Sequence, residues 1–116
     1  MPESKAGTWV KEIPFAVTVC DREGIILEMN DKSAKTFEKY GSRDLIGKNV
    51  FDCHPEPARS KLKKLMGKQE SNAYTVEKKG VKKLIYQTPW YENGGYMGFV
   101  EISIEIPKEM PHYKRD

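Results

Sequence analysis

The sequence predicts an α+β domain in which several short helices gather on one face of an antiparallel sheet. Two short apolar runs joined by a turn occupy residues 15–29 and indicate a β-hairpin. Residues 30–68 contain helix-capping residues, prolines and one helical repeat of apolar residues. Residues 73–106 contain three longer strand-like runs separated by glycine turns. Strands followed by helices and then by strands again are typical of this fold class.

The composition is that of a globular protein with no nucleic-acid or membrane partner expected. Hydrophobic residues make up 38% of the 116 residues and charged residues 32%, which is too apolar for a disordered chain. The net charge is +3 with both signs mixed, and the densest basic stretch, Arg59–Lys64, is interpreted as a solvated helix face. No apolar run approaches the ~20 residues that cross a bilayer, and no signal peptide begins the sequence. We therefore expect a cytoplasmic protein whose cysteines, Cys20 and Cys53, stay reduced.

Three segments are expected: an N-terminal arm of residues 1–12, a domain of residues 13–107 and a polar C-terminal tail of residues 108–116. Thr8 is expected to cap one amphipathic turn in the arm. This region carries apolar side chains that a domain core does not need, and such side chains often mark contacts. We therefore expect a homodimer that uses the arm, the outer face of the sheet, or both. The apolar side chains are Trp9, Val10 and Ile13.

Turn residues mark the ends of five predicted strands. Asp21-Arg22-Glu23-Gly24 separates the first two strands, Lys79-Gly80 separates the third from the fourth, and Asn93-Gly94 separates the last two. Asn-Gly between two strand-like runs is the strongest short signal for a hairpin. The expected strands are Phe15–Cys20, Ile25–Met29, Ala73–Lys78, Lys83–Tyr91 and Tyr96–Ile106.

The last predicted strand alternates between apolar and polar residues, so its two faces differ. One face is expected to pack on the core, and the other to meet water or a partner. Val100, Ile102, Ile104 and Ile106 share one side, and Glu101, Ser103 and Glu105 share the other.

Two helices are predicted from caps and periodicity. Asn30 stands where a helix cap belongs, and Ala34, Phe37 and Tyr40 then recur at a spacing of three up to Gly41. Residues 42–51 are expected to form short helical turns. Pro55 and Pro57 suit only the first turn of a second, longer helix that runs to about Lys68. Its buried face is expected to include Leu65, with Lys64 solvated. The apolar face of this second helix comprises Ala58, Leu62, Leu65 and Met66.

Residues at the joints between these elements carry a family resemblance. Gly24 permits a tight turn, Asn30 caps a helix, and Gly47 allows a bend that a Cβ would crowd. The matching residues are Asp21, Gly24, Ile26, Asn30, Ala34, Phe37, Tyr40, Gly41 and the segment Asp44-Leu45-Ile46-Gly47-Lys48. With these residues in register with the predicted elements, the chain resembles the PAS family over residues 13–106.

The resemblance implies a five-stranded antiparallel sheet cupped around short helices. Such domains often hold a small molecule between sheet and helices, and often dimerise through the outer sheet face or an N-terminal helix. They are usually joined to a kinase, a cyclase or a transcription factor, and no such output domain is found here. We therefore expect a non-enzymatic sensory module that signals through a separate protein, or a segment of a longer protein.

Flavin photochemistry is not expected. Flavin-binding PAS photoreceptors carry a reactive cysteine in the motif Gly-x-Asn-Cys, whereas this sequence has Gly47-Lys48-Asn49-Val50. Cys53 comes three residues later and would not reach the same flavin carbon.

A haem-binding gas or redox sensor is an alternative, because some PAS oxygen sensors hold haem through one histidine. His54 precedes the long helix, and imidazole is a good iron ligand when an apolar wall surrounds the ring. The other interpretation of His54 is a local cap or hydrogen bond at the start of the helix. The apolar wall would be formed by Leu62, Leu65, Met66, Tyr86 and Trp90.

Catalytic and metal sites are not expected. Cys53 and His54 are adjacent, so their side chains point apart, and no motif supplies an orienting residue. Glu56 completes a cluster of metal-ligand types with them, but Pro55 stiffens the run and a second pair of ligands is missing.

The expected small-molecule site lies between the long helix and the sheet. A sensor should have an open cavity there, whereas a ligand-free interaction module should have the same space filled by side chains. Tyr74, Tyr86 and Trp90 are expected to face inward from the strands. The predicted lining residues are Phe37, Leu65, Met66, Tyr74, Tyr86 and Trp90.

Overall fold

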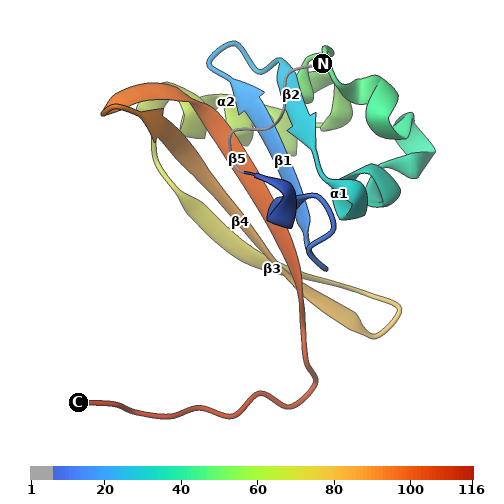
Figure 1. The fold of residues 1–116 in the computed structure, drawn as a ribbon, viewed down its shortest axis with the longest axis vertical. Coiled ribbons are helices and arrows are strands. Elements are labelled where there is room, and N and C mark those ends of the chain that lie inside the picture. The colour runs from blue at the N-terminus through green and yellow to red at the C-terminus, as the bar shows by residue number, and fades with distance from the viewer. Residues whose placement is uncertain (1–6) are drawn as a thin grey trace.

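The computed structural model describes residues 7–116 and consists of one five-stranded antiparallel sheet with helices on one face (Figure 1). The strand order is β2-β1-β5-β4-β3, so β2 and β3 are the two edges. The predicted α+β class is confirmed. No helix among residues 7–116 is long and apolar enough to cross a membrane. The elements are η1 (Thr8–Val10), β1 (Ala16–Asp21), β2 (Ile26–Met29), α1 (Asp31–Thr36), η2 (Glu38–Tyr40), η3 (Ser42–Leu45), η4 (Val50–Cys53), α2 (Ala58–Lys68), β3 (Asn72–Lys78), β4 (Val81–Glu92) and β5 (Gly95–Ile106).

Both C-terminal hairpins turn where the sequence predicts. Lys79 and Gly80 have φ angles of 53° and 80°, and Asn93 and Gly94 have φ angles of 51° and 83°. Two consecutive residues with positive φ are typical of the type I′ turn, whose twist matches that of the flanking strands. The turn chemistry therefore sets the register of β3 with β4, whereas the register of β4 with β5 also depends on an irregularity between Trp90 and Tyr91.

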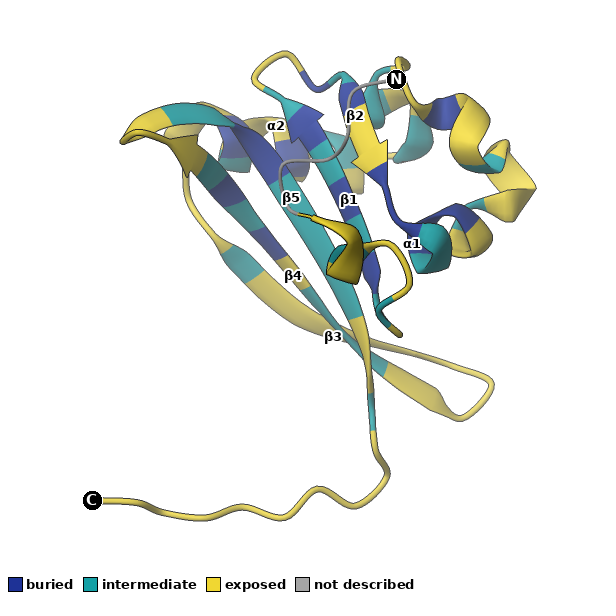
Figure 2. Cartoon of the chain, in the orientation of Figure 1, coloured by how far each residue is buried: buried dark blue, intermediate teal, exposed yellow. Residues whose placement is uncertain are grey.

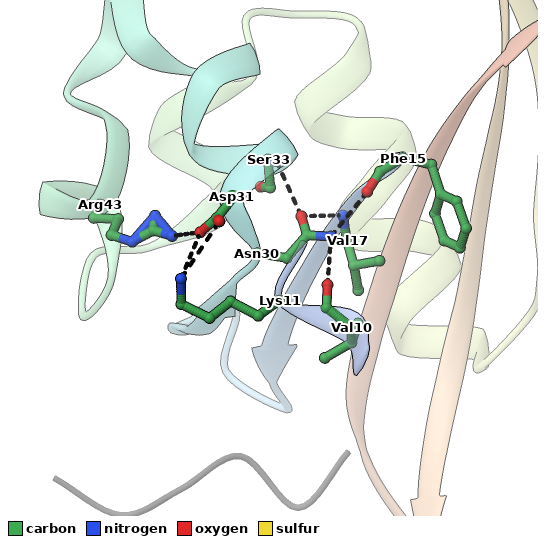
Figure 3. A network of polar contacts seen from close by, with 8 residues as sticks. All are labelled: Val10, Lys11, Phe15, Val17, Asn30, Asp31, Ser33 and Arg43. Atoms are coloured by element: carbon green, nitrogen blue, oxygen red, sulfur yellow. Dashed lines mark hydrogen bonds and ion pairs between the residues drawn. The ribbon is translucent and has the colours of Figure 1, made fainter. Parts of the chain in front are cut away.

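Asn30 joins the N-terminal turn, β1 and α1. Its Oδ1 accepts hydrogen bonds from the backbone N–H of Ser33 at 3.0 Å and of Val17 at 2.9 Å. Its Nδ2 donates to the carbonyls of Val10 at 3.0 Å and of Phe15 at 2.8 Å (Figure 3). The predicted cap is confirmed, and the same side chain also holds the chain that enters β1.

The next residue, Asp31, pairs with cations from two other segments. Lys11 Nζ lies 3.4 Å from its Oδ2, and the Arg43 guanidinium donates to its Oδ1 (Figure 3). The Arg43 hydrogen bond is the main cause that lowers the pKa of the Asp31 carboxyl, with Lys11 adding to it. The residues before β1, the start of α1 and the turn η3 are therefore tied together at one point.

Two local expectations are wrong. The helix expected to run from Asn30 to Gly41 is two pieces, because Phe37 leaves helical geometry with a ψ of 19° and a separate 3₁₀ turn, η2, follows. Thr8 lies inside the turn η1, and Gly7 takes the cap position without a side-chain hydrogen bond. The remainder of the expected arm, residues 1–6, lies outside the described residues.

The core lies between the helices and one face of the sheet, which we call the inner face. Cys20 and Phe99 from the sheet pack against Leu62 and Met66 of α2 in one cluster. Leu65 is half-buried at the margin of this cluster, and Lys64 is exposed as expected. A second cluster joins the β2 side of the sheet to η3 and comprises Ile26, Met29 and Leu45.

The polar side of β5 faces the helices. Buried Phe99 marks the inner face, and Glu101 lies two residues further along the same strand, on the same side. The apolar side of β5 therefore lies on the opposite face, the outer face, where Ile104 is 38% exposed. Figure 2 shows that burial is concentrated where β1, β4 and β5 pass the helices, whereas the far end of the β3–β4 hairpin is exposed.

Candidate functional site

A small cavity lies between the helices and the centre of the inner face. Its volume is about 30 Å³, which gives room for about two water molecules. Most of its lining is apolar and comes from the sheet, from α2 and from the short helical segments between β2 and α2. Examples are Met29, Leu62 and Phe37, and Gln87 and Glu101 add polar groups. We call this space the inner cavity.

A larger groove opens beside the inner cavity, between the start of α2 and the strands β3 and β4. Its volume is about 320 Å³, at the lower end of the ~300–1,000 Å³ typical of small-molecule sites. Pro57, Ala58 and Lys61 form its helical wall, and Asn72 and Tyr74 form its β3 wall. We call it the helix–strand groove. It shares three lining residues with the inner cavity, namely His54, Leu62 and Gln87.

A row of polar side chains crosses the inner face from β3 to β5. Asn72 pairs with Gln87 in the sheet register, and Gln87 pairs with Glu101. Asn72 Nδ2 donates to Gln87 Oε1 at 3.2 Å, and Gln87 Nε2 donates to Glu101 Oε1 at 2.9 Å. These bonds fix the orientation of the Gln87 amide, which is only 5% exposed. The polar row therefore links the helix–strand groove to the inner cavity.

The polar groups of this face continue onto β1 and α1. Thr18 is the register partner of Glu101 on β1, and its hydroxyl lies 2.5 Å from that of Ser33. Ser33 has no exposed surface. Because buried hydroxyls are stable only when they are hydrogen-bonded, this pair fixes α1 against the sheet.

Gln87 retains hydrogen-bonding capacity toward a ligand. A carboxamide offers two N–H donors and an oxygen with two lone pairs. Across the described residues, one donor is used by Glu101 and one lone pair by Asn72. Gln87 therefore keeps one donor and one lone pair beyond the bonds of the row, and its side chain lines the helix–strand groove.

His54 lines both spaces and makes a local hydrogen bond. Its Nδ1 lies 2.9 Å from the carbonyl oxygen of Val50 in η4. Because a carbonyl only accepts, Nδ1 is the donor in this hydrogen bond. The expected local hydrogen bond is thus present, with a partner in the preceding turn rather than in α2.

The inner cavity beside His54 is too small for haem in this structure. The inner cavity of about 30 Å³ is an order of magnitude smaller than a small-molecule site. Four of the five side chains expected to wall the porphyrin do not line this cavity: Leu65, Met66, Tyr86 and Trp90.

Four of the six predicted ligand residues lie away from both spaces. Phe37 lines the inner cavity and Tyr74 lines the helix–strand groove. Leu65 and Met66 belong to the packed core between α2 and the sheet. The remaining two, Tyr86 and Trp90, lie on the outer face.

The expectation that Tyr86 and Trp90 face inward is wrong, because strand residues alternate between faces. Gln87 lies between them on β4 and points inward, so its neighbour Tyr86 points outward and is 42% exposed. Trp90 has the same parity as Tyr86, and its Nε1 donates to the carbonyl of Cys20 on β1 at 2.9 Å. Its register partner on the intervening strand is Gly98, where a Cβ would come within 2.0 Å of that carbonyl oxygen.

The residues missed by the sequence-based prediction are the polar ones. Gln87 has the parity of Ile85 and Pro89 along β4, and both neighbours are at least partly buried. An uncharged polar residue between two apolar residues of the same face is a readable signal of a buried hydrogen-bonding group. Asn72 and Glu101 carry no such signal and become visible only through the pairing of the strands.

Neither cysteine is activated for chemistry. Cys20 and Cys53 both line the inner cavity, and burial raises the pKa of each thiol above its ordinary value. Both side chains are therefore neutral thiols near pH 7, and the thiolate is the reactive form. His54 directs Nδ1 to Val50 rather than to a thiol. Within residues 7–116, no three His, Cys, Asp or Glu side chains lie close enough together to hold a metal ion.

Tyr74 carries the aromatic part of the groove wall. Burial raises the pKa of its hydroxyl, and the negative charge of Glu101 raises it further. At neutral pH the hydroxyl is therefore neutral and can donate a hydrogen bond.

Comparison with known proteins gives one family and a set of structural neighbours. A family model described as PAS fold matches residues 10–108, whereas no curated protein matches the sequence. A C-terminal domain from Streptococcus mutans is similar with a TM-score of 0.69 at 18% identity, over 90% of each chain. The PAS domain of BvgS from Bordetella pertussis has a TM-score of 0.65 at 18% identity, over 85% of this chain and 82% of that one.

A third neighbour is the Aer2 receptor of Vibrio cholerae, which is described as a dual PAS–haem oxygen sensor. Its TM-score is 0.58 at 18% identity, over 80% of this chain and 95% of that one. At these identities the likeness shows a shared fold.

Proposed function

The chain belongs to the PAS family, and on this premise we propose that it is a sensory module that binds a small molecule in the helix–strand groove. PAS domains are sensory signalling modules, and domains of this fold occur in sensor kinases and receptors. We propose that this module acts by binding and by a change of packing, without chemistry on a substrate. It would work in the cytoplasm, where its two free thiols remain reduced.

One observation carries the proposal: the hydrogen-bonded row Asn72, Gln87 and Glu101. A ligand that bonds to the free donor or lone pair of Gln87 competes with, or reinforces, the bonds that fix this amide. Any change in the amide acts on β3 through Asn72 and on β5 through Glu101. Binding in the groove is thereby coupled to the pairing of three strands.

The signal would leave through the outer face, where we propose that a second copy docks. Ile102, Ile104 and Tyr86 contribute apolar surface there, and Ile104 and Tyr86 are 38% and 42% exposed. Apolar patches of this kind commonly mark contacts between proteins. A shift in strand pairing would alter this surface and so the contact with the second copy or with a separate signalling protein.

A ligand-free interaction module is the second candidate, and the size of the inner cavity favours it. With a volume of about 30 Å³, the core beneath the helices is filled by the protein's own side chains. In this alternative the groove stays empty and the outer face alone carries the function. A haem sensor that uses His54 is not supported by an observation of this kind.

Native mass spectrometry and thermal unfolding of the purified protein, screened against a panel of small metabolites, test the ligand proposal. We expect at least one compound to bind and to raise the unfolding temperature. Gln87→Leu should abolish this shift, whereas Tyr86→Leu, at the neighbouring position on the opposite face, should retain it.

Two other outcomes would contradict the ligand proposal. If no compound shifts unfolding while the protein dimerises, the interaction module is favoured. An intense Soret band that is lost in His54→Ala would instead establish the haem sensor.

A further inference from the structure

The two edges of the sheet differ in how their backbone groups are used. At the β2 edge, the N–H of Ile26 donates to the Lys48 carbonyl at 2.9 Å, and the N–H of Gly47 donates to the Ile26 carbonyl at 2.8 Å. At the other edge, β3 pairs with β4 alone, and within residues 7–116 no backbone hydrogen bond joins it to another segment. The outward N–H and C=O groups of β3 are therefore open to a further strand.

The first five residues of β3 lack the usual protection of an exposed edge, and the charged residues Glu77 and Lys78 stand only at its end. Natural edges are commonly blocked by a proline, a bulge or an inward charge. Residues 72–76 have neither proline nor charge, and β3 pairs with β4 in unbroken register. Tyr74 and Val76, both residues with high strand propensity, are 41% and 42% exposed.

The tip of the same hairpin is strongly basic. Four of its residues between 78 and 83 are lysines, and within the described part of the chain none of the four forms an ion pair. Alternation along the strands places Lys78 and Lys83 on the inner side with Tyr74 and Val76. We call this region, Lys78 to Lys83, the basic hairpin. It projects beyond the helices (Figure 2).

We propose that the free edge of β3 binds an extended acidic segment of a partner protein, which adds to the sheet as a sixth strand. The ladder of alternating N–H and C=O groups requires a polypeptide backbone, which neither a nucleic acid nor a lipid supplies. The unpaired lysines select acidic side chains on the inner side of that segment, because Lys78 lies on the neighbouring strand β3 and Lys83 lies one strand further, on β4. A second copy of β3 is disfavoured as the partner, because it brings its own basic hairpin and like charges repel.

The partner would bind the outward backbone groups of β3, whereas the groove uses the inward side chains of Asn72 and Tyr74 on the same strand, and the dimer would use the outer face. The proposal adds a class of partner to the sensory function and depends on neither ligand nor dimer. Its failure would therefore leave the ligand and dimer experiments unaffected.

Fluorescence anisotropy at low ionic strength tests the proposal with three labelled peptides of equal length. The first alternates valine and glutamate, the second alternates valine and lysine, and the third is the first with its valines replaced by proline. We expect the acidic peptide to bind at least about tenfold more tightly than the basic one. The proline peptide should lose binding because it lacks half of the backbone donors and because proline fixes φ away from strand geometry. Added salt should weaken binding.

Charge reversal at the two edges supplies the matched comparison. Lys78→Glu/Lys83→Glu should weaken binding of the acidic peptide about tenfold or more, whereas Arg22→Glu/Lys48→Glu, near the covered β2 edge, should leave it within about twofold. Three of the four residues are exposed, and Lys83 is half-buried. Thermal unfolding of each double variant checks that it folds. Hydrogen exchange should show slower exchange at residues 72–78 when the acidic peptide is bound.

Three results would overturn the proposal. Equal affinity for the acidic and basic peptides would remove the charge argument, and retained binding of the proline peptide would remove the added strand. An oligonucleotide that binds more tightly than the acidic peptide and depends on Lys78 and Lys83 would identify the basic hairpin as a nucleic-acid surface instead.

Discussion

The two faces of the sheet differ in polarity, and along β5 the usual distribution is reversed. The inner face, which the helices cover, carries the polar row from Asn72 to Glu101 at its centre. The outer face carries the regular apolar alternation of β5, with Ile104 exposed. A polar row is stable under helices only because its members satisfy one another. An apolar row without a cover makes sense when another molecule supplies one. The comparison therefore supports the proposal that a ligand contacts the inner face and that a second copy contacts the outer face.

The largest expected effect lies in the packing of α2 on the inner face. Leu62 is 6% exposed in the larger core cluster, so Leu62→Ala should lower the free energy of unfolding by about 2–5 kcal/mol. Leu65→Ala should lower it by about 1–2 kcal/mol, since Leu65 is only half-buried. Chemical denaturation measures both. Lys64→Ala is the control and should change stability by less than about 0.5 kcal/mol. Equal effects of the three substitutions would mean that a different side of α2 faces the sheet.

The next effect breaks the polar row itself. Gln87→Leu keeps approximately the volume of the side chain but removes the partners of Asn72 and Glu101, and should lower the free energy of unfolding by about 1–3 kcal/mol. Tyr86→Phe, one residue away on the outer face, should change it by less than about 0.5 kcal/mol. A Gln87→Leu variant as stable as the native protein would show that the polar row is dispensable for folding. That result would favour a role of the row in ligand binding.

Substitutions on the outer face should change the oligomeric state of the protein rather than its free energy of unfolding. Ile104→Glu places a charge in the centre of the proposed contact and should convert a dimer to a monomer in light scattering. Ile46 is exposed to a similar degree, 41% against 38% for Ile104, and Ile46→Glu should leave the dimer intact. A native protein that stays monomeric at high concentration would remove the dimer from the proposal.

The smallest effect separates the two thiols of the inner cavity. Cys20 is 5% exposed and Cys53 is half-buried, so alkylation near pH 8 should modify Cys53 before Cys20. Both rates should be lower than that of a free cysteine, because burial raises the pKa of each thiol and leaves less thiolate at that pH. Raising the pH should accelerate both reactions. Mass spectrometry of timed samples follows them, and faster modification of Cys20 would indicate that the cavity opens on its side.

The fold was predictable because turn and capping residues mark the ends of its strands and helices. Lys79-Gly80 and Asn93-Gly94 demand tight hairpin turns, Asn30 caps a helix, and α2 begins at Ala58 directly after Pro57. Each signal acts within a few residues of the chain. No tertiary information is needed to read them.

The candidate site was predictable only in part, because the face of a strand that the helices cover depends on tertiary packing. Alternation along β5 indicates that its two sides differ but not which side the helices cover. Tyr86 and Trp90 were therefore expected inside on hydrophobicity, whereas Gln87 lies there with its hydrogen bonds satisfied. The volume of the cavity depends on the mutual packing of α2 and the sheet, and no single segment encodes it.

The hydrogen bond from the Trp90 indole to the Cys20 carbonyl makes Trp90 an intrinsic fluorescent probe of the sheet. Indole emission depends on hydration and on hydrogen bonding at Nε1, and this indole spans from β4 to β1 across Gly98. The second tryptophan, Trp9, is 65% exposed and emits as a hydrated reference. In Trp9→Phe the remaining fluorescence would report the separation of three central strands. Ligand binding, dimerisation and strand addition could then be followed as changes in one emission spectrum without any label.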